Sequence, residues 1–228
     1  SLVFKDKKAE MEEVILKLNN HNNYFNVELK KDSVWALVDS DRSALDQKID
    51  SAGEPLGELF DVGSGMQTGL NSVFVFQEKP KGIPDEFIRC RVSGENIERY
   101  LIQDSSEYCL YVEDVEDFDA LPLEVRTYLE DNKEKLSARA DKKRRATAKW
   151  WNFTFAMHKE LYLLPKIWTS YRAKNNTFAL DENNKYLGLT NTTAIFGSNS
   201  DTDLRYVLAL LNSSLLNYRY KTLGKQTG

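Results

Sequence analysis

Residues 60–76 read FDVGSGMQTGLNSVFVF. The glycines raise the question of a loop that binds a nucleotide or S-adenosylmethionine, which requires a strand, a glycine turn and then a helix whose first amides meet the ligand. Residues 60–65 satisfy the first half of this requirement. The second half fails, because the residues after Gly65 run through a tight turn into SVFVF (72–76), a β-branched and aromatic run typical of a strand. No Gly-Lys-Ser/Thr follows, which also excludes a Walker loop. We therefore expect no cofactor-binding site in this chain.

On either side of this turn, strands and helices follow each other without a regular βαβ rhythm. This order predicts an α+β fold, with mixed sheets and flanking helices. Apolar spacing predicts helices at 6–19, 40–53, 121–151 and 201–218, the last capped by Asp201 or Asp203 and packed on the strands through Leu204, Val207, Leu208, Leu211 and Leu215. Alternating or β-branched runs predict strands at 24–38, 72–76, 83–92, 107–114, 161–171, 176–180 and 190–196.

The chain has 228 residues, of which 41% are hydrophobic, enough for one large domain or two small ones. No apolar run approaches the roughly 18 residues that cross a bilayer, and the opening residues lack the apolar core of a secretory signal. We therefore expect a cytoplasmic protein without a membrane partner. Cys90 and Cys109 have no CxxC or histidine-rich company, so we expect no metal site in this chain and two reduced, buried thiols.

Charge is divided unevenly along the chain. Residues 1–132 carry 14 Lys and Arg against 28 Asp and Glu, and residues 133–228 carry 17 against 7, giving −14 and +10. This asymmetry indicates that the second part faces a polyanion. The alternative is that the two parts attract each other within the protein.

The order of several short motifs resembles the TaqI-like specificity domain of adenine-specific DNA methyltransferases and type IIG restriction-modification enzymes. The signature G-x-Q-T-G-x-N-x-x-F stands at 65–74, and similar pieces follow in VSGENIERY (92–100), YCLYV (108–112), KWWNF (149–153), PKIWTS (165–170) and VLALLNSSLLNY (207–218). The resemblance implies a target-recognition domain at 35–220, preceded by a helix and lead-in strand at 1–34 and followed by a truncated end at 221–228.

That resemblance implies double-stranded DNA as a partner, together with a methyltransferase domain of the same polypeptide that uses S-adenosylmethionine. The chain contains no Asn/Asp-Pro-Pro-Tyr/Phe element to hold a target adenine. We therefore expect a recognition domain separated from its catalytic domain, with no catalytic residue of its own.

Candidate DNA contacts fall into four groups. Polar side chains of the glycine turn, a basic run with two tryptophans behind it, an arginine-tyrosine pair and a polar loop after PKIWTS all offer groups for phosphates or base edges. These candidates are Gln67, Thr68 and Asn71; Lys142, Lys143, Arg144, Arg145 and Lys149, in a run that also contains Arg139; Arg99 beside Tyr100; and Tyr171, Arg172, Lys174 and Asn175, with Trp168 and Asn176 nearby.

Each group has a structural alternative. The turn can bond its own backbone, the basic run can be a solvated helix end, and Arg99 can bond carbonyls or an acidic neighbour. For the whole chain, the alternative is a protein-binding or structural α+β module without DNA contact. An independent enzyme has the weakest support, because Glu28 and Lys30 form only a common Glu-x-Lys pattern and His21 and His158 lack a nucleophile.

Overall fold

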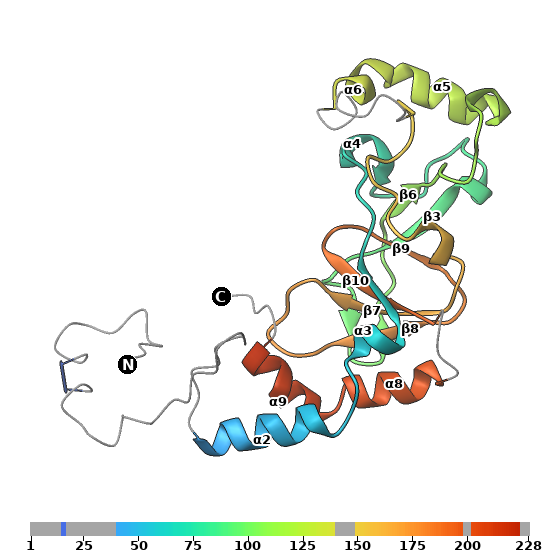
Figure 1. Cartoon of the computed structure of the whole chain (residues 1–228). Coiled ribbons are helices and arrows are strands. Elements are labelled where there is room, and N and C mark those ends of the chain that lie inside the picture. The colour runs from blue at the N-terminus through green and yellow to red at the C-terminus, as the bar shows by residue number, and fades with distance from the viewer. Residues whose placement is uncertain (1–14, 17–39, 140–148, 198–201, 224–228) are drawn as a thin grey trace. The chain divides into compact units, whose positions relative to one another are not determined.

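The computed structural model describes residues 15–16, 40–139, 149–197 and 202–223 (Figure 1). The chain divides into two compact units, Ser1–Glu54 and Pro55–Gly228. In the first unit, residues 15–16 are helical and α2 spans Ser40–Ser51, as predicted for 40–53. The strand predicted at 24–38 and the rest of the helix predicted at 6–19 lie outside the described residues.

One sheet of the second unit has four strands in the order β1-β10-β7-β8, all antiparallel. They span Asp61–Ser64 (β1), Thr192–Phe196 (β10), Lys166–Ser170 (β7) and Phe178–Asp181 (β8). Side chains alternate between the two faces, as the pleat of a strand requires. Ile167 and Ile195 pair across the strands and pack with α8, whereas Trp168 and Ala194 join the main core.

A second four-stranded sheet has the order β2-β6-β3-β9, and it is mixed because β3 and β9 run parallel. Its strands are Val75–Phe76 (β2), Tyr108–Leu110 (β6), Ile88–Val92 (β3) and Tyr186–Gly188 (β9), and a small hairpin joins Ile97–Glu98 (β4) to Leu101–Ile102 (β5). The expected α+β fold with mixed sheets is confirmed. Cys90 and Cys109 are free thiols on β3 and β6, and burial raises the pKa of Cys109 to about 12.

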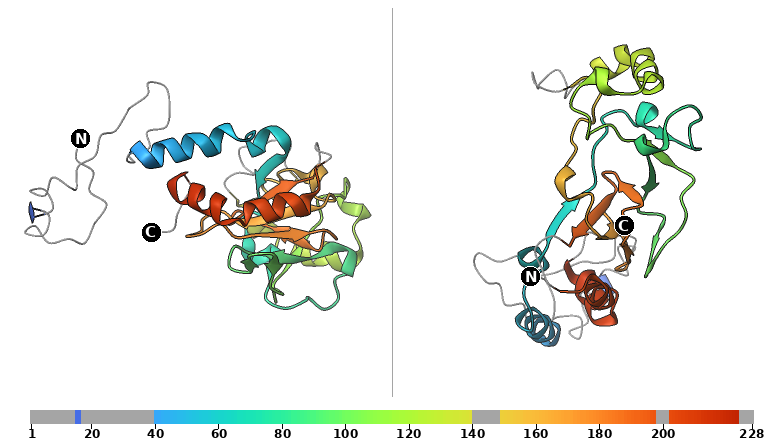
Figure 2. Two further views of the ribbon diagram at one scale, coloured as in Figure 1. Left: turned by 90° about the horizontal axis from the view of Figure 1, so that it is seen from below. Right: turned by 90° about the vertical axis from the view of Figure 1, so that its right-hand side faces the viewer.

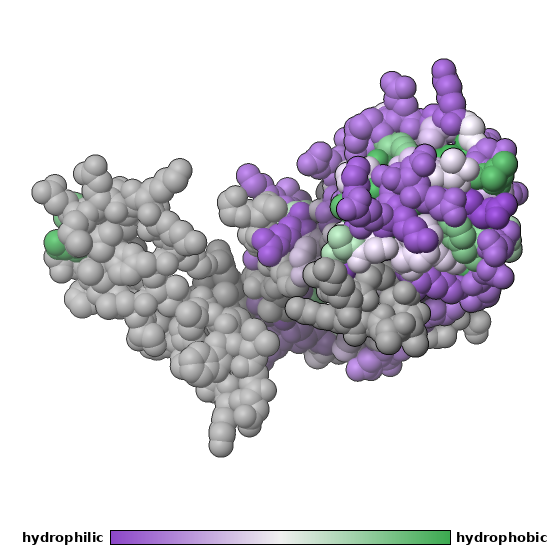
Figure 3. Space-filling view, turned by 90° about the horizontal axis from the view of Figure 1, so that it is seen from above, coloured by the Kyte–Doolittle hydropathy of each residue, from purple (hydrophilic) through white to green (hydrophobic). Residues whose placement is uncertain are grey.

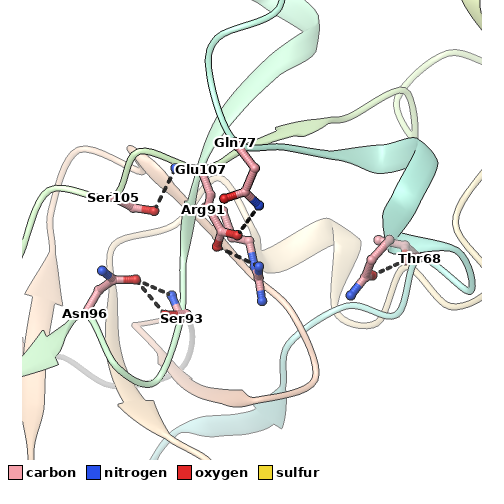
Figure 4. A network of polar contacts seen from close by, with 8 residues as sticks. Thr68, Gln77, Arg91, Ser93, Asn96, Ser105 and Glu107 are labelled. Atoms are coloured by element: carbon pink, nitrogen blue, oxygen red, sulfur yellow. Dashed lines mark hydrogen bonds and ion pairs between the residues drawn. The ribbon is translucent and has the colours of Figure 1, made fainter.

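Polar contacts pin the turns that connect this second sheet (Figure 4). The side-chain oxygen of Asn96 accepts hydrogen bonds from the Ser93 amide at 3.2 Å and hydroxyl at 2.6 Å. On β3, Arg91 pairs with Glu107 at 2.7 Å, so its charge is neutralised beside the sheet. The Asn96 contacts close the turn at 93–96, which leads from β3 into the β4–β5 hairpin.

Short helical turns fill the connections: α3 (Leu56–Leu59), α4 (Asn71–Phe74), η2 (Asp85–Phe87), η3 (Phe118–Ala120) and η4 (Lys159–Leu161). The prediction of a strand over 72–76 was wrong for its first three residues. Thr68 and Asn71 organise a helical turn that buries the adjacent Val73 and Phe74 together, and Phe74 packs edge-on against Phe153 at 5.0 Å. A strand would have turned one of the two neighbours outward.

Among the described residues of the long helical pattern predicted at 121–151 lie two shorter helices, α5 (Leu123–Asp131) and α6 (Lys133–Ser137), while 140–148 are outside the described residues. The break falls at Asn132, whose side-chain amide donates to the Tyr128 carbonyl at 2.9 Å and so competes with the helix backbone. Val125, Leu129 and Leu136 form the buried face of these two helices. In the view from above, most of the described surface is hydrophilic (Figure 3).

The helix predicted at 201–218 is also divided, into α8 (Leu204–Leu211) and α9 (Ser214–Leu223). Asp203 caps α8 as predicted, accepting from the Arg205 amide at 2.8 Å. Residues of α8 pack on β7 and β8, so that the helix lies along this sheet (Figure 2). Leu215, however, is 53% exposed, so its predicted place on the packed face was wrong.

Candidate nucleic-acid interface

The first glycine of the turn is enclosed by backbone. The Gly65 amide donates to Thr192 O at 3.0 Å, and the Met66 amide donates to Gly188 O at 2.9 Å. A Cβ placed on Gly65 would lie 2.2 Å from Leu189 O. The amides that would face a methyl donor are therefore already bonded, and the helix that follows, α4, is a single turn. These residues do not fit an S-adenosylmethionine cradle.

The centre of the turn is tied to its own backbone. Thr68 is 2% exposed; its hydroxyl donates to the Asn71 side-chain oxygen at 2.5 Å and accepts from the Leu70 amide at 3.1 Å. Gly69 has a φ of 75°, and a Cβ there would lie 1.9 Å from the Thr154 hydroxyl. Thr68 thus has the structural role considered above, while Asn71 is exposed and Gln67 half-buried.

Arg139 is the buried link between this turn and the helices. It is 7% exposed, and its guanidinium donates to four carbonyls: Leu136 at 2.9 Å, Thr68 at 2.6 Å, Trp150 at 2.7 Å and Asn152 at 2.9 Å. Burial lowers its pKa from the ordinary arginine value. Counting Arg139 with a DNA-facing basic run was therefore wrong, because its donors hold the glycine turn in place.

Most of the predicted basic run lies outside the described residues: Lys142, Lys143, Arg144 and Arg145. Its last member, Lys149, is described. Its ammonium donates to Glu116 at 2.9 Å and to Val115 O at 3.3 Å, and it lies 5.2 Å from the centre of the Trp151 ring.

The uneven charge is partly compensated inside the second unit. Three cations from the basic part of the chain pair with carboxylates from its acidic part, namely Lys149 with Glu116 at 2.9 Å, Lys159 with Asp114 at 3.8 Å and Lys185 with Asp104 at 3.0 Å. Internal attraction therefore explains a share of the asymmetry, as the alternative interpretation expected.

The arginine-tyrosine pair anchors a hairpin. Arg99 donates through its guanidinium to Asn212 O, where α8 ends. Tyr100 has a φ of 69° and its amide donates to Phe178 O at 2.9 Å. The carbonyl-bonded alternative is thus the arrangement found for Arg99, although the residue is also exposed at the surface.

The loop between β7 and β8 presents all four of its predicted DNA contacts to solvent: Tyr171, Arg172, Lys174 and Asn175. Two neighbours that the sequence placed with them are buried. Trp168 lies in the core and donates to Asp181 at 3.4 Å, and Asn176 bonds the carbonyls of Leu211 and Ser213. Only the tip of the loop therefore offers groups to a ligand.

The structure brings the glycine turn and this loop to the same end of one sheet. Ser64 at the end of β1 pairs with Thr193 near the start of β10, and Thr193 pairs with Thr169 near the end of β7. The chain leaves both β1 and β7 at this end, which we call the loop edge. The Tyr171 amide donates to Asn191 O at 3.0 Å and so holds the loop beside β10.

The sequence around the 171–175 loop contains basic but no acidic residues. No acidic residue occurs between Glu160 and Asp181 or after Asp203. Arg172 and Lys174 therefore have no acidic neighbour along the chain, whereas Lys149 and Lys159 pair with carboxylates of residues 113–119.

Sequence reasoning missed the residues that support the loop. Asn212 and Asn217 were predicted only as part of a helix, and Tyr220 was not singled out, but all three bond backbone groups of β8 or its preceding loop. The signal was two asparagines inside an apolar helical pattern, since asparagine disfavours helix interiors.

A pocket of about 230 Å³ lies away from the loop edge. Asn184, which lines it, accepts from Lys166 at 3.0 Å, and Lys166 is the residue of β7 furthest from the 171–175 loop. Three charged groups of its lining are engaged with protein, since Lys159 pairs with Asp114 and Arg89 donates to Glu86 O at 2.7 Å. None of the predicted site residues lines this pocket.

Comparison with protein families assigns residues 91–228 to the TaqI-like C-terminal specificity domain. This match covers more than half of the chain. The chain belongs to the TaqI-like specificity domain family. No curated protein matches it in sequence.

Among solved structures, this specificity domain is similar to the type IIL restriction-modification enzyme MmeI, which was solved in complex with DNA. The TM-score is 0.56 at 15% identity, and the match covers 76% of this chain and 23% of the MmeI chain. The likeness shows a shared fold over about a quarter of that enzyme. Within the described residues, no helix is both long and apolar enough to span a membrane.

Proposed function

We propose that this chain is the sequence-specific DNA recognition domain of a restriction-modification DNA methyltransferase that modifies adenine N6. The observation that carries the proposal is the exposed 171–175 loop. The loop exposes an aromatic ring, two cationic side chains and a side-chain amide at the loop edge of the sheet. The glycine turn at the same edge adds further polar groups.

The loop has the chemistry for both base and backbone contact. An asparagine such as Asn175 can bond adenine through two atoms in the major groove, and an arginine such as Arg172 can do the same with guanine. Lys174 suits phosphate oxygens, and Tyr171 can pack against sugar or base. We include the exposed Asn71 and Arg99 and the half-buried Gln67 at the margin of this surface, and Lys142, Lys143, Arg144, Arg145 and Lys149 as phosphate contacts.

Catalysis and S-adenosylmethionine binding belong, in this proposal, to another domain of the same cytoplasmic polypeptide. The enclosed Gly65 supports this division. We expect calorimetry to show no micromolar binding of S-adenosylmethionine to the 228-residue chain. Such binding would contradict the division of roles.

A protein-binding role is the second candidate. Tyr206, Leu210 and Leu215 are exposed on α8 and α9 by 60%, 45% and 53%, which offers apolar surface to a partner. This role and DNA recognition differ in their dependence on salt, because neutralised phosphates release counterions and apolar contacts do not.

The deciding experiment is a titration of the chain with fluorescent duplex DNA at several salt concentrations. DNA recognition predicts an affinity that falls steeply and linearly on a logarithmic salt scale. A library of random duplexes then identifies the preferred sequence. Absence of salt-dependent binding, in this chain and in the full-length protein, would overturn the proposal.

A further inference from the structure

The loop at 171–175 is bonded to α9 and to the junction between α8 and α9. The hydroxyl of one α9 residue makes two of these contacts. The Tyr220 hydroxyl accepts from the Ala173 amide at 3.2 Å and donates to Ala173 O at 2.8 Å. Both backbone groups at the middle of the loop are therefore bonded to a single side chain of α9.

The end of the loop is fixed by a second contact to α9. The Asn176 amide donates to the side-chain oxygen of Asn217 at 3.1 Å, and the buried Asn176 side chain donates to the carbonyls of Leu211 and Ser213. The Asn176 side chain thus bonds the junction between the two helices, and its backbone amide ties the end of the loop to α9.

The strand that follows the loop is fixed in the same way. Asn212 is fully buried, and its side chain accepts from the Phe178 amide at 3.1 Å and donates to Phe178 O at 2.9 Å. These two hydrogen bonds resemble those that a neighbouring strand would make with Phe178. They also explain why α8 ends before Asn212, since the Asn212 side chain is bonded to β8.

We propose that α9 and its junction with α8 act as a clamp that sets the conformation of the 171–175 loop, and that Tyr220 and Asn217 are positioning residues for recognition of the DNA target. This inference rests on the proposed function. Neither residue touches DNA in it; each acts through the loop backbone.

The physical reason is the entropy of the loop. A loop that is already ordered before binding loses less conformational entropy when it binds its target. Because its side chains are fixed in advance, it binds well only to the base edges that match them. A loosened loop can adapt to many sequences. Freeing the clamp should therefore reduce the preference for the target while leaving contacts to phosphates intact.

Tyr220→Phe tests the clamp, because it removes one hydroxyl and keeps the ring. Tyr206→Phe is the matched control, since it makes the same change at an exposed tyrosine of α8. Asn217→Ala tests the second contact independently. The full-length protein carries each variant, and binding is measured on the duplex selected by the wild type and on a scrambled duplex.

We expect Tyr220→Phe and Asn217→Ala each to lower the ratio of target to scrambled affinity by about 10-fold. Affinity for the scrambled duplex and the salt slope should not change, and Tyr206→Phe should match the wild type. Hydrogen exchange should become faster at residues 171–176 in both clamp variants. A role in stability alone would lower the melting temperature without altering the ratio for folded protein.

Two results would overturn the inference, and they are distinguishable. An unchanged ratio in both clamp variants of a protein that does prefer one sequence would refute the clamp and leave the proposed function standing. A wild type that binds all duplexes equally would refute sequence recognition itself, even with faster exchange in the variants.

Discussion

Replacing Arg139 with alanine should destabilise the second unit more than any surface substitution. The guanidinium lies between the glycine turn, the end of α6 and residues 150–152, and it donates to four carbonyls. Two of these acceptors have another amide donor: Thr68 O receives Thr154 N at 3.3 Å, and Leu136 O receives the Ala138 amide. The other two, on Trp150 and Asn152, receive a described hydrogen bond only from Arg139.

The magnitude follows from those two carbonyls. A fully buried acceptor left without a donor costs about 1–3 kcal/mol, which sets an upper range of roughly 2–6 kcal/mol for the pair, because both bonds are only part-buried. Removing the charge relieves part of the desolvation that lowers the Arg139 pKa, and water can reach part of the site. We therefore expect the free energy of unfolding to fall by about 3 kcal/mol.

Urea unfolding of the second unit, followed by tryptophan fluorescence, measures this loss. Arg139→Lys should recover less than half of it, because an ammonium cannot span carbonyls that a planar guanidinium reaches together. Arg205→Ala is the control, since its side chain is 70% exposed and pairs only with Glu182 among described residues; it should cost under about 1 kcal/mol. A loss below about 1 kcal/mol for Arg139→Ala, or wild-type stability for Arg139→Lys, would refute the reasoning.

Three further predictions concern binding and pH. Changing Lys142 and Arg144 to alanine together should lower the salt slope of log K by about 2 and weaken binding to every duplex alike; an unchanged slope would remove these residues from the interface. Alanine at Arg172 or Asn175 should cost roughly 1–3 kcal/mol on the preferred target and much less on random duplex, measured in the full-length protein, whereas equal losses would assign the loop to the backbone. Lys166 is fully buried, and desolvation lowers its pKa from 10.5 to about 8. Between these pH values the unfolded chain binds one proton more than the folded chain, so the free energy of unfolding rises with pH across this window. The rise should approach roughly 3 kcal/mol by pH 10.5 and should be missing in Lys166→Met; the same pH profile of stability in both proteins would contradict it.

The fold class and most elements were predictable because apolar periodicity carries them. The strands at β7, β8 and β10 and the cap at Asp203 were correctly predicted. Both long helix predictions failed at an asparagine, Asn132 or Asn212, where a side-chain amide bonds a backbone group and ends a helix that the apolar pattern would continue. The short strands β1, β4, β5 and β9 were missed, since none shows a clear alternating run.

The candidate site was predictable in composition but not in placement. A polar, basic loop after PKIWTS stands out in the sequence, and its exposure is confirmed for Tyr171, Arg172, Lys174 and Asn175. Sequence could not separate these from Asn176, which is buried, because the sorting depends on which amide meets the α8–α9 junction. Contact of any of these residues with DNA stays a prediction.

By itself, the sequence determined the family, through the order of its motifs, and the α+β class, through local periodicity. Only the tertiary structure decided what the motif residues do. Thr68 and Arg139 carry polar groups that suit a DNA contact equally well in sequence, yet both are enclosed and bonded to protein. The physical reason is that a polar group is available to a ligand only when no nearer partner satisfies it, and for Arg139 the partners at Thr68, Trp150 and Asn152 are 71, 11 and 13 positions away along the chain.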